Sequence, residues 1–354
     1  MKIVHFVPFA PNACGMYEAA RDMYVADLKA GHDVHMVDVG VTVNGKHKPG
    51  SVGKNDNRNG LNIITENQNV VLDADIIMAH TGVSDNWLVK CQAPMFWVMH
   101  GRPAACFKPE QFKNRSSYSL MAEIATWQRA KVLLSFWEYH RIFWKPIIPA
   151  NKLVILPAPP IDGSRFRKNG KTHFFNAAKD GMYNIIMAES WREDVDCYEI
   201  VHGVIEAAKK QPGIKAHIYA MESPVPKCWE YLLSELRKYN ALGEIWGRRP
   251  NMEEIYRAGD ILLSPQRIVT RTVGEALCCG LPVIADEGNE FATWQANIRE
   301  PDKLAELIIQ AIKDLSTKRS EIWKKVEKTA LSFSLTAYSL QMNDLYKKHA
   351  LKRG

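Results

Sequence analysis

The sequence predicts an α/β protein built from two Rossmann-like, doubly wound domains. With 354 residues and 46% hydrophobic content, the chain is long enough for two cores of ordinary size. Short apolar runs alternate with helical patterns in both halves, as they do in βαβ units. A proline-rich break, Leu156-Pro-Ala-Pro-Pro160, separates the two series. These three observations favour two domains joined near residue 158.

The first half begins with a strand and an amphipathic helix. Apolar side chains recur at helical spacing in Met16–Ala30, and Gly31 is a suitable stop for that helix. Short apolar runs predict buried parallel strands at Lys2–Val7, His35–Val39, Ala74–Ala79, Phe96–His100 and Lys131–Phe136. We therefore expect an N-terminal Rossmann-like domain over residues 1–158.

The second half repeats the scheme and ends in helices. Strands are predicted at Asn184–Ala188, Ile214–Ala220, Glu244–Trp246, Asp260–Ser264 and Pro282–Asp286. An apolar stripe from Leu304 to Leu315 predicts a helix, and a last helix is expected around Ser334–Lys348. We assign residues 159–333 to a C-terminal domain and residues 334–354 to a final helix.

Two polar segments carry many cations. Asn44–Asn59 is rich in glycine and includes Lys46 and Lys48, so we expect a basic loop there. Arg165–Phe174 contains an Asn-Gly pair between short polar-aromatic stretches, which predicts a hairpin. The cations of this second segment are Arg165, Arg167, Lys168 and Lys171. Both segments could contact a binding partner. The alternative for each is an ordinary surface loop exposed to solvent.

Composition narrows the class of protein further. The formal net charge of +7 favours an anionic partner, which leaves nucleotides, nucleic acid and anionic membranes open. Seven scattered cysteines form no zinc-like Cys-x-x-Cys pair. Neither a signal peptide nor a run of 18 apolar residues is present, so we expect a cytoplasmic protein without a transmembrane segment. If a phage encodes the chain, the expected location is the cytoplasm of the phage's host.

The run from Arg271 to Asp286 is the most informative stretch of the chain. Its sequence, Arg-Thr-Val-Gly-Glu-Ala-Leu-Cys-Cys-Gly-Leu-Pro-Val-Ile-Ala-Asp, indicates a helix, a glycine stop and a buried strand. Glu275 would stand in the first helical turn, where a carboxylate can bind the hydroxyls of a ribose. The alternative is that Glu275 is an ordinary acidic residue at the start of a helix, where the helix dipole stabilises it.

This run resembles the donor-nucleotide segment of GT-B glycosyltransferases of the retaining family-four type. Their pattern is Glu-x7-Glu followed by Ala-x-Ala-x-Gly-x-Pro-Val, and Glu275 matches the second acid. Arg267 occupies the slot of the first acid, which is a departure from the pattern. The resemblance implies an N-terminal acceptor domain and a C-terminal nucleotide-sugar donor domain that face each other across a cleft. It also implies that the last helix crosses back to the N-terminal domain.

The resemblance also assigns roles to other positions. Gly15 corresponds to the glycine loop beneath the donor diphosphate, and His100 to a histidine that faces the donor sugar. Arg192 and Arg271 would stabilise the diphosphate, with Arg267 and Thr272 beside them. Arg248 lies in the turn expected along the nucleotide base. Among these residues, His100, Arg192 and Arg271 are the candidate catalytic residues.

These parts indicate a glycosyltransferase that uses a nucleotide sugar, expected to be UDP-linked, with retention. Fixed guanidinium groups can stabilise the leaving diphosphate, so we expect no metal ion and no cofactor beyond the nucleotide sugar. A dinucleotide-dependent oxidoreductase is disfavoured, because the Gly-x-Gly-x-x-Gly fingerprint is missing after the first strand. A non-catalytic nucleic-acid or carbohydrate binder on a GT-B frame remains a further alternative.

Two kinds of acceptor molecule are candidates. Cys14-Gly-Met and the Arg271–Glu275 run also resemble phage glycosyltransferases that modify hydroxymethylated bases in DNA. The two basic segments would then contact double-stranded DNA, and interleaved phenylalanines would stack on an extruded base. The alternative acceptor is a cell-envelope glycan or glycolipid. We expect a 5-hydroxymethylpyrimidine in DNA.

Overall fold

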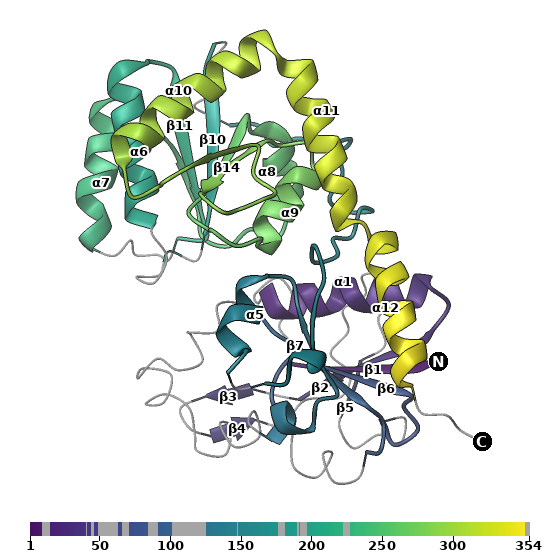
Figure 1. The fold of residues 1–354 in the computed structure, drawn as a ribbon. Helices are drawn as coiled ribbons and strands as arrows, with labels where there is room; N and C mark the ends of the chain where they lie inside the picture. Colours follow the sequence, from purple (N-terminus) through teal and green to yellow (C-terminus); the bar gives the residue numbers. More distant parts are fainter. Residues whose placement is uncertain are drawn as a thin grey trace. The chain divides into compact units, whose positions relative to one another are not determined.

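The structure is a computed structural model, and it divides into two compact units. Unit 1 comprises Met1–Pro160 and Leu335–Gly354, and unit 2 comprises Ile161–Ser334 (Figure 1). Each unit is described by itself. The described residues are 1–8, 15–39, 41–43, 46–48, 63–65, 71–83, 91–100, 125–146, 148–175, 181–189, 191, 197–221 and 227–350.

Unit 1 is built on a seven-stranded sheet in the order β5-β2-β1-β6-β7-β8-β9, and every neighbouring pair in it is parallel. Its central strands are buried and, apart from Lys2 and His5 of β1, apolar, as is usual in parallel sheets that are covered on both faces. The strands are β1 (Lys2–Val7), β2 (Asp33–Asp38), β5 (Ile63–Thr65), β6 (Ile76–Ala79), β7 (Met95–Val98), β8 (Val132–Ser135) and β9 (Leu153–Ile155).

The other elements of unit 1 include a short hairpin and three helices. Strands β3 (Val41–Val43) and β4 (Lys46–Lys48) pair antiparallel. The remaining elements are α1 (Gly15–Lys29), α5 (Tyr139–Trp144), the 3₁₀ turn η4 (Ala150–Lys152) and α12 (Leu335–His349). Residues 46–48 of the expected basic loop therefore form a strand, whereas residues 44–45 and 49–59 of that loop lie outside the described residues.

The last helix, α12, completes the core of unit 1. It lies beside α1 in Figure 1, and the Ser339 hydroxyl donates to the Ala26 carbonyl at 3.0 Å. Tyr338, Met342 and Tyr346 are buried in the same apolar cluster as α1 and the sheet. The chain therefore returns to its first unit, in agreement with the expected crossing of the final helix.

Unit 2 has a six-stranded parallel sheet in the order β12-β11-β10-β13-β14-β15. The strands are β10 (Tyr183–Ala188), β11 (Ile214–Tyr219), β12 (Leu242–Ile245), β13 (Ile261–Ser264), β14 (Val283–Asp286) and β15 (Trp294–Ala296). The helical elements are α6 (Cys197–Lys210), α7 (Lys227–Lys238), α8 (Met252–Ala258), α9 (Arg271–Cys278), α10 (Pro301–Thr317), α11 (Arg319–Ala330) and the 3₁₀ turn η5 (Leu331–Phe333).

Helix α9 is fixed at both ends by local hydrogen bonds. Thr270 caps its start, where the side-chain oxygen accepts from the Val273 N–H at 3.4 Å. At its end Gly280 has φ +83°, and the Leu281 N–H donates to the Ala276 carbonyl at 2.9 Å. This is the Schellman ending for which glycine is preferred, because a side chain would strain that φ.

The structure confirms the predicted fold class of two doubly wound α/β sheets and corrects one predicted element. Residues 165–174 contain no strand, so the expected hairpin is wrong. This segment is an irregular loop against α8, where the Arg257 side chain donates to the carbonyls of Lys171 and Arg167 at 2.8 and 3.1 Å. Tertiary contacts with one helix thus override the local turn signal.

Candidate functional site

The start of α9 brings together two predicted donor residues. The Arg271 Nε atom lies 2.6 Å from the Glu275 Oε1 atom, one helical turn further on, and each side chain is 13% exposed. Because the helix begins at Arg271, Glu275 stands in the second turn and not in the expected first turn. The carboxylate is therefore held by the cation while remaining partly accessible.

Other predicted donor residues lie close to this helix in the sequence. Thr272 is half-buried in the first turn of α9. Arg267 is exposed in the loop before it and donates to Asp286 at 3.1 Å, at the carboxyl end of β14. Loops at the carboxyl ends of parallel strands are where doubly wound folds bind ligands, so these residues occupy the appropriate edge of the unit 2 sheet.

A buried carboxylate at the same edge was not singled out in the sequence. Glu189 directly follows β10 and accepts from the Ser264 hydroxyl at 3.0 Å and from the Gln266 amide at 3.1 Å. Strands β10 and β13 are neighbours at the point where the strand order reverses, which is the usual ligand position in open sheets. The sequence could have indicated Glu189 by its position alone, because it is an acidic residue directly after a predicted buried strand.

Tyr256 links the two carboxylates electrostatically. Burial raises the pKa of the Tyr256 hydroxyl well above its ordinary value, and the charges of Glu275 and Glu189 raise it further. Both acids therefore lie around one neutral phenol at this edge of unit 2.

The turn after β12 presents an aromatic ring with a cation above it. Trp246 is 42% exposed, and the Arg249 guanidinium carbon lies 4.5 Å from the centre of its ring. The indole N–H donates to Glu244 at 3.0 Å, which orients the ring. Arg248, the residue predicted to assist at the nucleotide base, is exposed in the same turn. An exposed, oriented ring offers a stacking surface that the sequence did not reveal.

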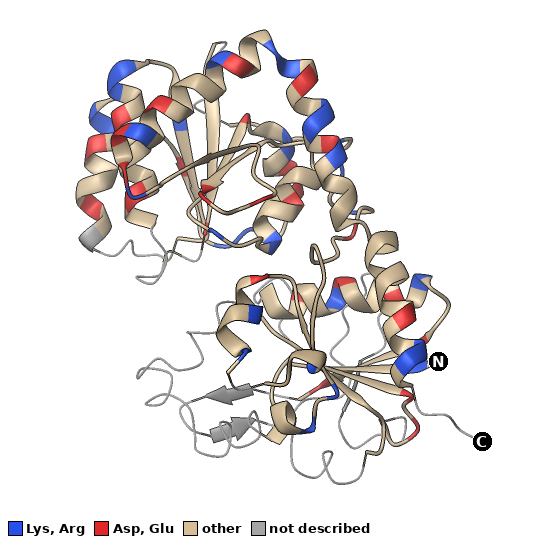
Figure 2. Cartoon of the chain, in the orientation of Figure 1, with Lys and Arg blue, Asp and Glu red and all other residues tan. Residues whose placement is uncertain are grey.

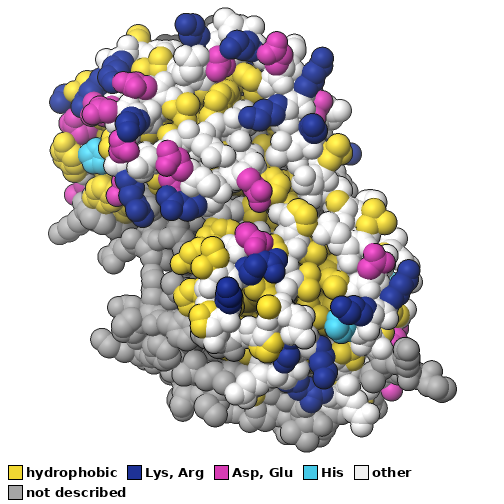
Figure 3. All heavy atoms as spheres, viewed as in Figure 1, with side chains coloured by type: hydrophobic (Ala, Val, Ile, Leu, Met, Phe, Trp, Pro, Cys, Tyr) yellow, Lys and Arg dark blue, Asp and Glu magenta, His cyan; other side chains and the backbone are white. Residues whose placement is uncertain are grey.

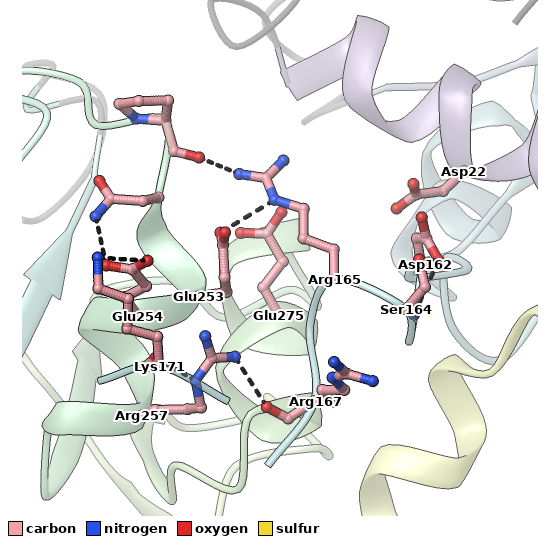
Figure 4. A network of polar contacts seen from close by, with 12 residues as sticks. Asp22, Asp162, Ser164, Arg165, Arg167, Lys171, Glu253, Glu254, Arg257 and Glu275 are labelled. Carbon is pink, nitrogen blue, oxygen red and sulfur yellow. Dashed lines mark hydrogen bonds and ion pairs between the residues drawn. The ribbon is translucent and has the colours of Figure 1, made fainter. Parts of the chain in front are cut away.

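The loop with the predicted acceptor cations is largely paired with acids. Figure 4 shows Arg165 reaching Glu253, at 3.0 Å, and Lys171 reaching Glu254, at 3.7 Å. Lys168 contacts Glu327 at 2.7 Å, whereas Arg167 is exposed. On the face seen in Figures 2 and 3, the described cations and anions of unit 2 are interspersed over α10 and α11.

The expected stacking phenylalanines differ from one another in exposure. Phe166 and Phe175 are 2% and 3% exposed, and only Phe174 of the three is exposed, at 76%. The Phe175 ring stacks on His217 with 3.9 Å between ring centres. Two of the three rings therefore belong to the unit 2 core, and their predicted role of stacking on a base is wrong.

Three predicted positions are described only in part or not at all. Arg192 lies outside the described residues. Lys46 and Lys48 belong to β4, whose backbone alone is described. Gly15 is the first residue of α1, and a Cβ atom built there meets no atom of the described residues within 4 Å.

In unit 1, His100 ends a line of four polar side chains, Asp27, His5, His80 and His100, which we call the histidine row. The Asp27 Oδ2 atom lies 3.2 Å from His5 Nε2, His5 Nδ1 lies 3.1 Å from His80 Nε2, and His80 Nδ1 lies 2.9 Å from His100 Nε2. The Tyr346 hydroxyl of α12 also donates to Asp27, at 3.0 Å.

The imidazoles at the end of the histidine row are neutral at pH 7. Burial, together with the nearby His140, lowers the pKa of His100 to about 4. Burial likewise lowers the pKa of His80 well below its ordinary value. His100, at the carboxyl end of β7, therefore offers hydrogen bonds rather than positive charge.

Two doubly wound units, with the last helix returned to the first unit, define the GT-B fold, and this chain has it. A glycosyltransferase from Rickettsia africae is similar over 100% of this chain and 99% of its own, with a TM-score of 0.67 and 16% identity. HepE of Anabaena, in complex with UDP and glucose, covers 98% of this chain and 99% of its own at a TM-score of 0.68 and 13% identity. An alpha-glucosyltransferase, in complex with UDP and a 13-mer DNA containing an HMU base, has the same coverage at a TM-score of 0.65 and 13% identity.

The sequence itself matches no protein-family model and no curated protein. Within the described ranges, no three His, Cys, Asp or Glu side chains are grouped as metal ligands would be. Asp194 and Asp196, which form an Asp-x-Asp pair of the kind that can bind a divalent cation, lie outside those ranges. No helix of the described residues is long and apolar enough to cross a membrane.

Proposed function

We propose that this protein is a glycosyltransferase that moves a sugar from a UDP-linked donor to an acceptor hydroxyl, with retention at the anomeric carbon. The observation that carries the proposal is the Arg271–Glu275 pair, held at the carboxyl edge of the second sheet of a GT-B fold. Solved structures of similar fold contain UDP or UDP-glucose, which supports the choice of donor.

Each residue of the site has a chemical task in this proposal. Glu275 accepts hydrogen bonds from donor hydroxyls, and Arg271 orients it. A guanidinium carries five N–H groups, so Arg271 can hold Glu275 and a phosphate oxygen at the same time. Arg192 and Arg267 supply further positive charge for the leaving diphosphate. Neutral His100 accepts from a hydroxyl of the sugar.

Retention requires little acid–base chemistry from the protein. The bond between the anomeric carbon and the phosphate oxygen breaks, and the acceptor oxygen bonds to the same face of that carbon. The acceptor proton passes to the departing phosphate oxygen, so no side chain has to act as a strong base. Cations fixed around the diphosphate stabilise the negative charge that develops on it.

Release of nucleoside diphosphate from a panel of UDP, GDP and ADP sugars tests the donor. We expect slow hydrolysis of at least one UDP sugar without added acceptor, and direct binding of UDP by calorimetry. If no nucleotide sugar is bound or hydrolysed, the enzyme proposal fails and a non-catalytic binder on a GT-B frame takes its place.

For the acceptor we propose a 5-hydroxymethylpyrimidine in double-stranded DNA. The net charge of +7 and the similar fold of the DNA-bound alpha-glucosyltransferase support this choice. The pairing of Arg165, Lys168 and Lys171 with acids favours the second candidate, a cell-envelope glycan or glycolipid. The two acceptors predict different products.

Mass spectrometry of the acceptor after incubation with the UDP sugar discriminates between them. The DNA proposal predicts a hexose or pentose added to a hydroxymethylated duplex but not to an unmodified duplex of the same sequence. It also predicts binding that weakens steeply with salt. Transfer to a lipid extract, together with no DNA binding at low salt, would establish the second candidate.

A further inference from the structure

The histidine row joins elements that are far apart in the sequence. Asp27 lies on α1, His5 on β1, His80 directly after β6 and His100 after β7. The parallel pairing of β1 with β6 places Phe6 opposite Ala79, which brings His5 and His80 together. Their rings stack with 5.3 Å between centres and an interplanar angle of 16°.

Three of the four side chains in the histidine row are almost completely buried. His5, Asp27 and His80 are 0%, 1% and 2% exposed. Each ring nitrogen of His5 and His80 meets another member of the row, so both imidazoles are fully used. Only His100, which is half-buried, has a ring nitrogen that no bond within the row engages.

Hydrogen-bond direction along the row follows from its carboxylate end. An ionised carboxylate can only accept, so His5 must donate from Nε2. In a neutral His5 the Nδ1 atom is then an acceptor, and it receives the Nε2–H of His80. By the same step His80 Nδ1 accepts the Nε2–H of His100. Three neutral rings in series therefore have one consistent arrangement.

We propose that the histidine row is a positioning device that fixes the tautomer of His100. It places the hydrogen of His100 on Nε2 and leaves the Nδ1 lone pair to accept from a ligand hydroxyl group. Asp27, His5 and His80 act through His100 and do not touch the ligand themselves. The ligand chemistry is that of a neutral polyol such as the sugar of the donor, so this part rests on the proposed function.

The neutrality of His100 supports the same ligand chemistry. An imidazole whose pKa is lowered to about 4 carries no charge at pH 7, so His100 is not a phosphate-binding cation. Within the described chain, no hydrogen bond of His100 other than that to His80 is formed. A lone-pair acceptor at this position selects O–H groups and disfavours anions.

The ¹⁵N chemical shifts of the histidine rings test the row directly. Long-range ¹H–¹⁵N spectra of the full-length protein, labelled at its 11 histidines, distinguish the two neutral tautomers. The His100 signals are identified by their loss in His100→Ala. We expect His5, His80 and His100 all to carry hydrogen on Nε2 at pH 7. Hydrogen on Nδ1 of His100 in the unmodified protein would overturn the proposal without any variant.

Transmission along the row is tested by His5→Gln. The glutamine amide can still donate to Asp27 but gives His80 no ring acceptor, and it has no contact with His100. We expect the His100 signals to shift towards a mixture of tautomers. The matched control is His32→Gln, which removes a 2.7 Å bond to Asn343 on α12 outside the row. An unchanged His100 in a folded His5→Gln protein would contradict transmission.

Enzyme turnover provides an independent test of the histidine row. With a UDP sugar, His5→Gln should lower kcat/KM about three- to tenfold, the effect of one misdirected hydrogen bond, whereas His32→Gln should not change it. If the tautomers are as expected but the protein binds no UDP sugar, the proposed function is wrong. The proposal that the histidine row fixes the His100 tautomer then still holds. If turnover is observed but the tautomers differ, the row alone is wrong.

Discussion

At the scale of single residues, the proposed donor site depends on a carboxylate, Glu275, that is already paired with a cation. Glu275 is held at 2.6 Å from Arg271, so the acid is oriented before any ligand arrives. Preorganisation of this kind lowers the entropic cost of binding, because fewer rotamers are frozen when the ligand enters. The site is thus prepared for hydroxyl groups.

Replacement of Glu275 by glutamine should weaken UDP-sugar binding by about 10- to 100-fold, since a hydrogen bond to a charged group contributes roughly 1.5–3 kcal/mol. Calorimetric titration with the donor measures the loss. Glu253→Gln is the matched control, because Glu253 pairs with Arg165 in the same network shown in Figure 4. Equal donor affinity in Glu275→Gln and the unmodified protein would reject the assigned role.

His217 makes the stability of unit 2 depend on pH. Its Nε2 atom donates to the Asn184 side chain at 3.0 Å, its Nδ1 atom accepts from the Glu244 N–H at 3.2 Å, and burial lowers its pKa to about 4. Because the unfolded chain binds this proton from its ordinary value of 6.5 downwards, stability is complete above pH 6.5 and is lost as the pH falls towards 4.

Between pH 7 and pH 5 this one group should remove on the order of 2 kcal/mol from the free energy of unfolding. Urea unfolding at both pH values measures the change. In His217→Gln the titrating ring is absent, so the fall over the same interval should be smaller by that amount. An identical fall in both proteins would assign the pH dependence to other groups.

At the scale of elements, α9 is packed too closely to accept a larger side chain at its centre. A Cβ atom on Gly274 would lie 2.6 Å from Phe333 Cδ1 and 3.2 Å from Ile161 Cγ1. The glycine thus lets η5 approach the helix that carries Arg271 and Glu275. The geometry of the donor site depends on this approach.

Gly274→Ala should destabilise unit 2 by roughly 1–3 kcal/mol through overpacking. It should also weaken donor binding, since α9 must shift. Thermal unfolding and calorimetry measure the two effects. Gly163→Ala is the control, because a Cβ atom there meets nothing within 4 Å. Equal stability of the two variants would show that Phe333 moves aside without cost.

Elements formed by apolar runs were predictable, whereas those formed by long-range contacts were not. Strands such as β1 and β13 are buried on both faces, so their sequences alone reveal them. Strand β4 was expected to be part of a loop, because its three residues, Lys-His-Lys, are all polar. The predicted hairpin near Gly170 failed because Arg257 pins that segment to α8.

The same distinction applies to the candidate site. His100 was predictable from its position after a strand, and the Arg271–Glu275 pair from spacing along one helix. His5 and His80 are 75 residues apart, and only the register of β1 against β6 brings them into contact. No periodicity encodes such a contact, so the histidine row could not be read from the sequence.

At the scale of the whole molecule, the two units should respond separately to core mutations. Met342 is fully buried in unit 1, whereas Leu340, on the same helix α12, is 66% exposed. Truncation of a buried methionine typically costs 2–5 kcal/mol, and truncation of an exposed leucine costs little.

Met342→Ala should therefore speed hydrogen exchange in the sheet of unit 1 and leave the sheet of unit 2 unchanged. Leu340→Ala should leave both sheets as they are. Exchange monitored by mass spectrometry, with peptides assigned to each sheet, measures this. Equal acceleration in both units would mean that they unfold as one cooperative block.

The return of α12 to unit 1 has a consequence for the order in which the protein is made. Unit 2 is one continuous stretch, Ile161–Ser334, and can acquire its fold as soon as it leaves the ribosome. The first 160 residues must wait for α12, whose Tyr346 hydroxyl binds the buried Asp27 carboxylate. Residues 1–160 are thus translated before unit 2 but complete their fold after it, so a chaperone would have most to protect in this segment.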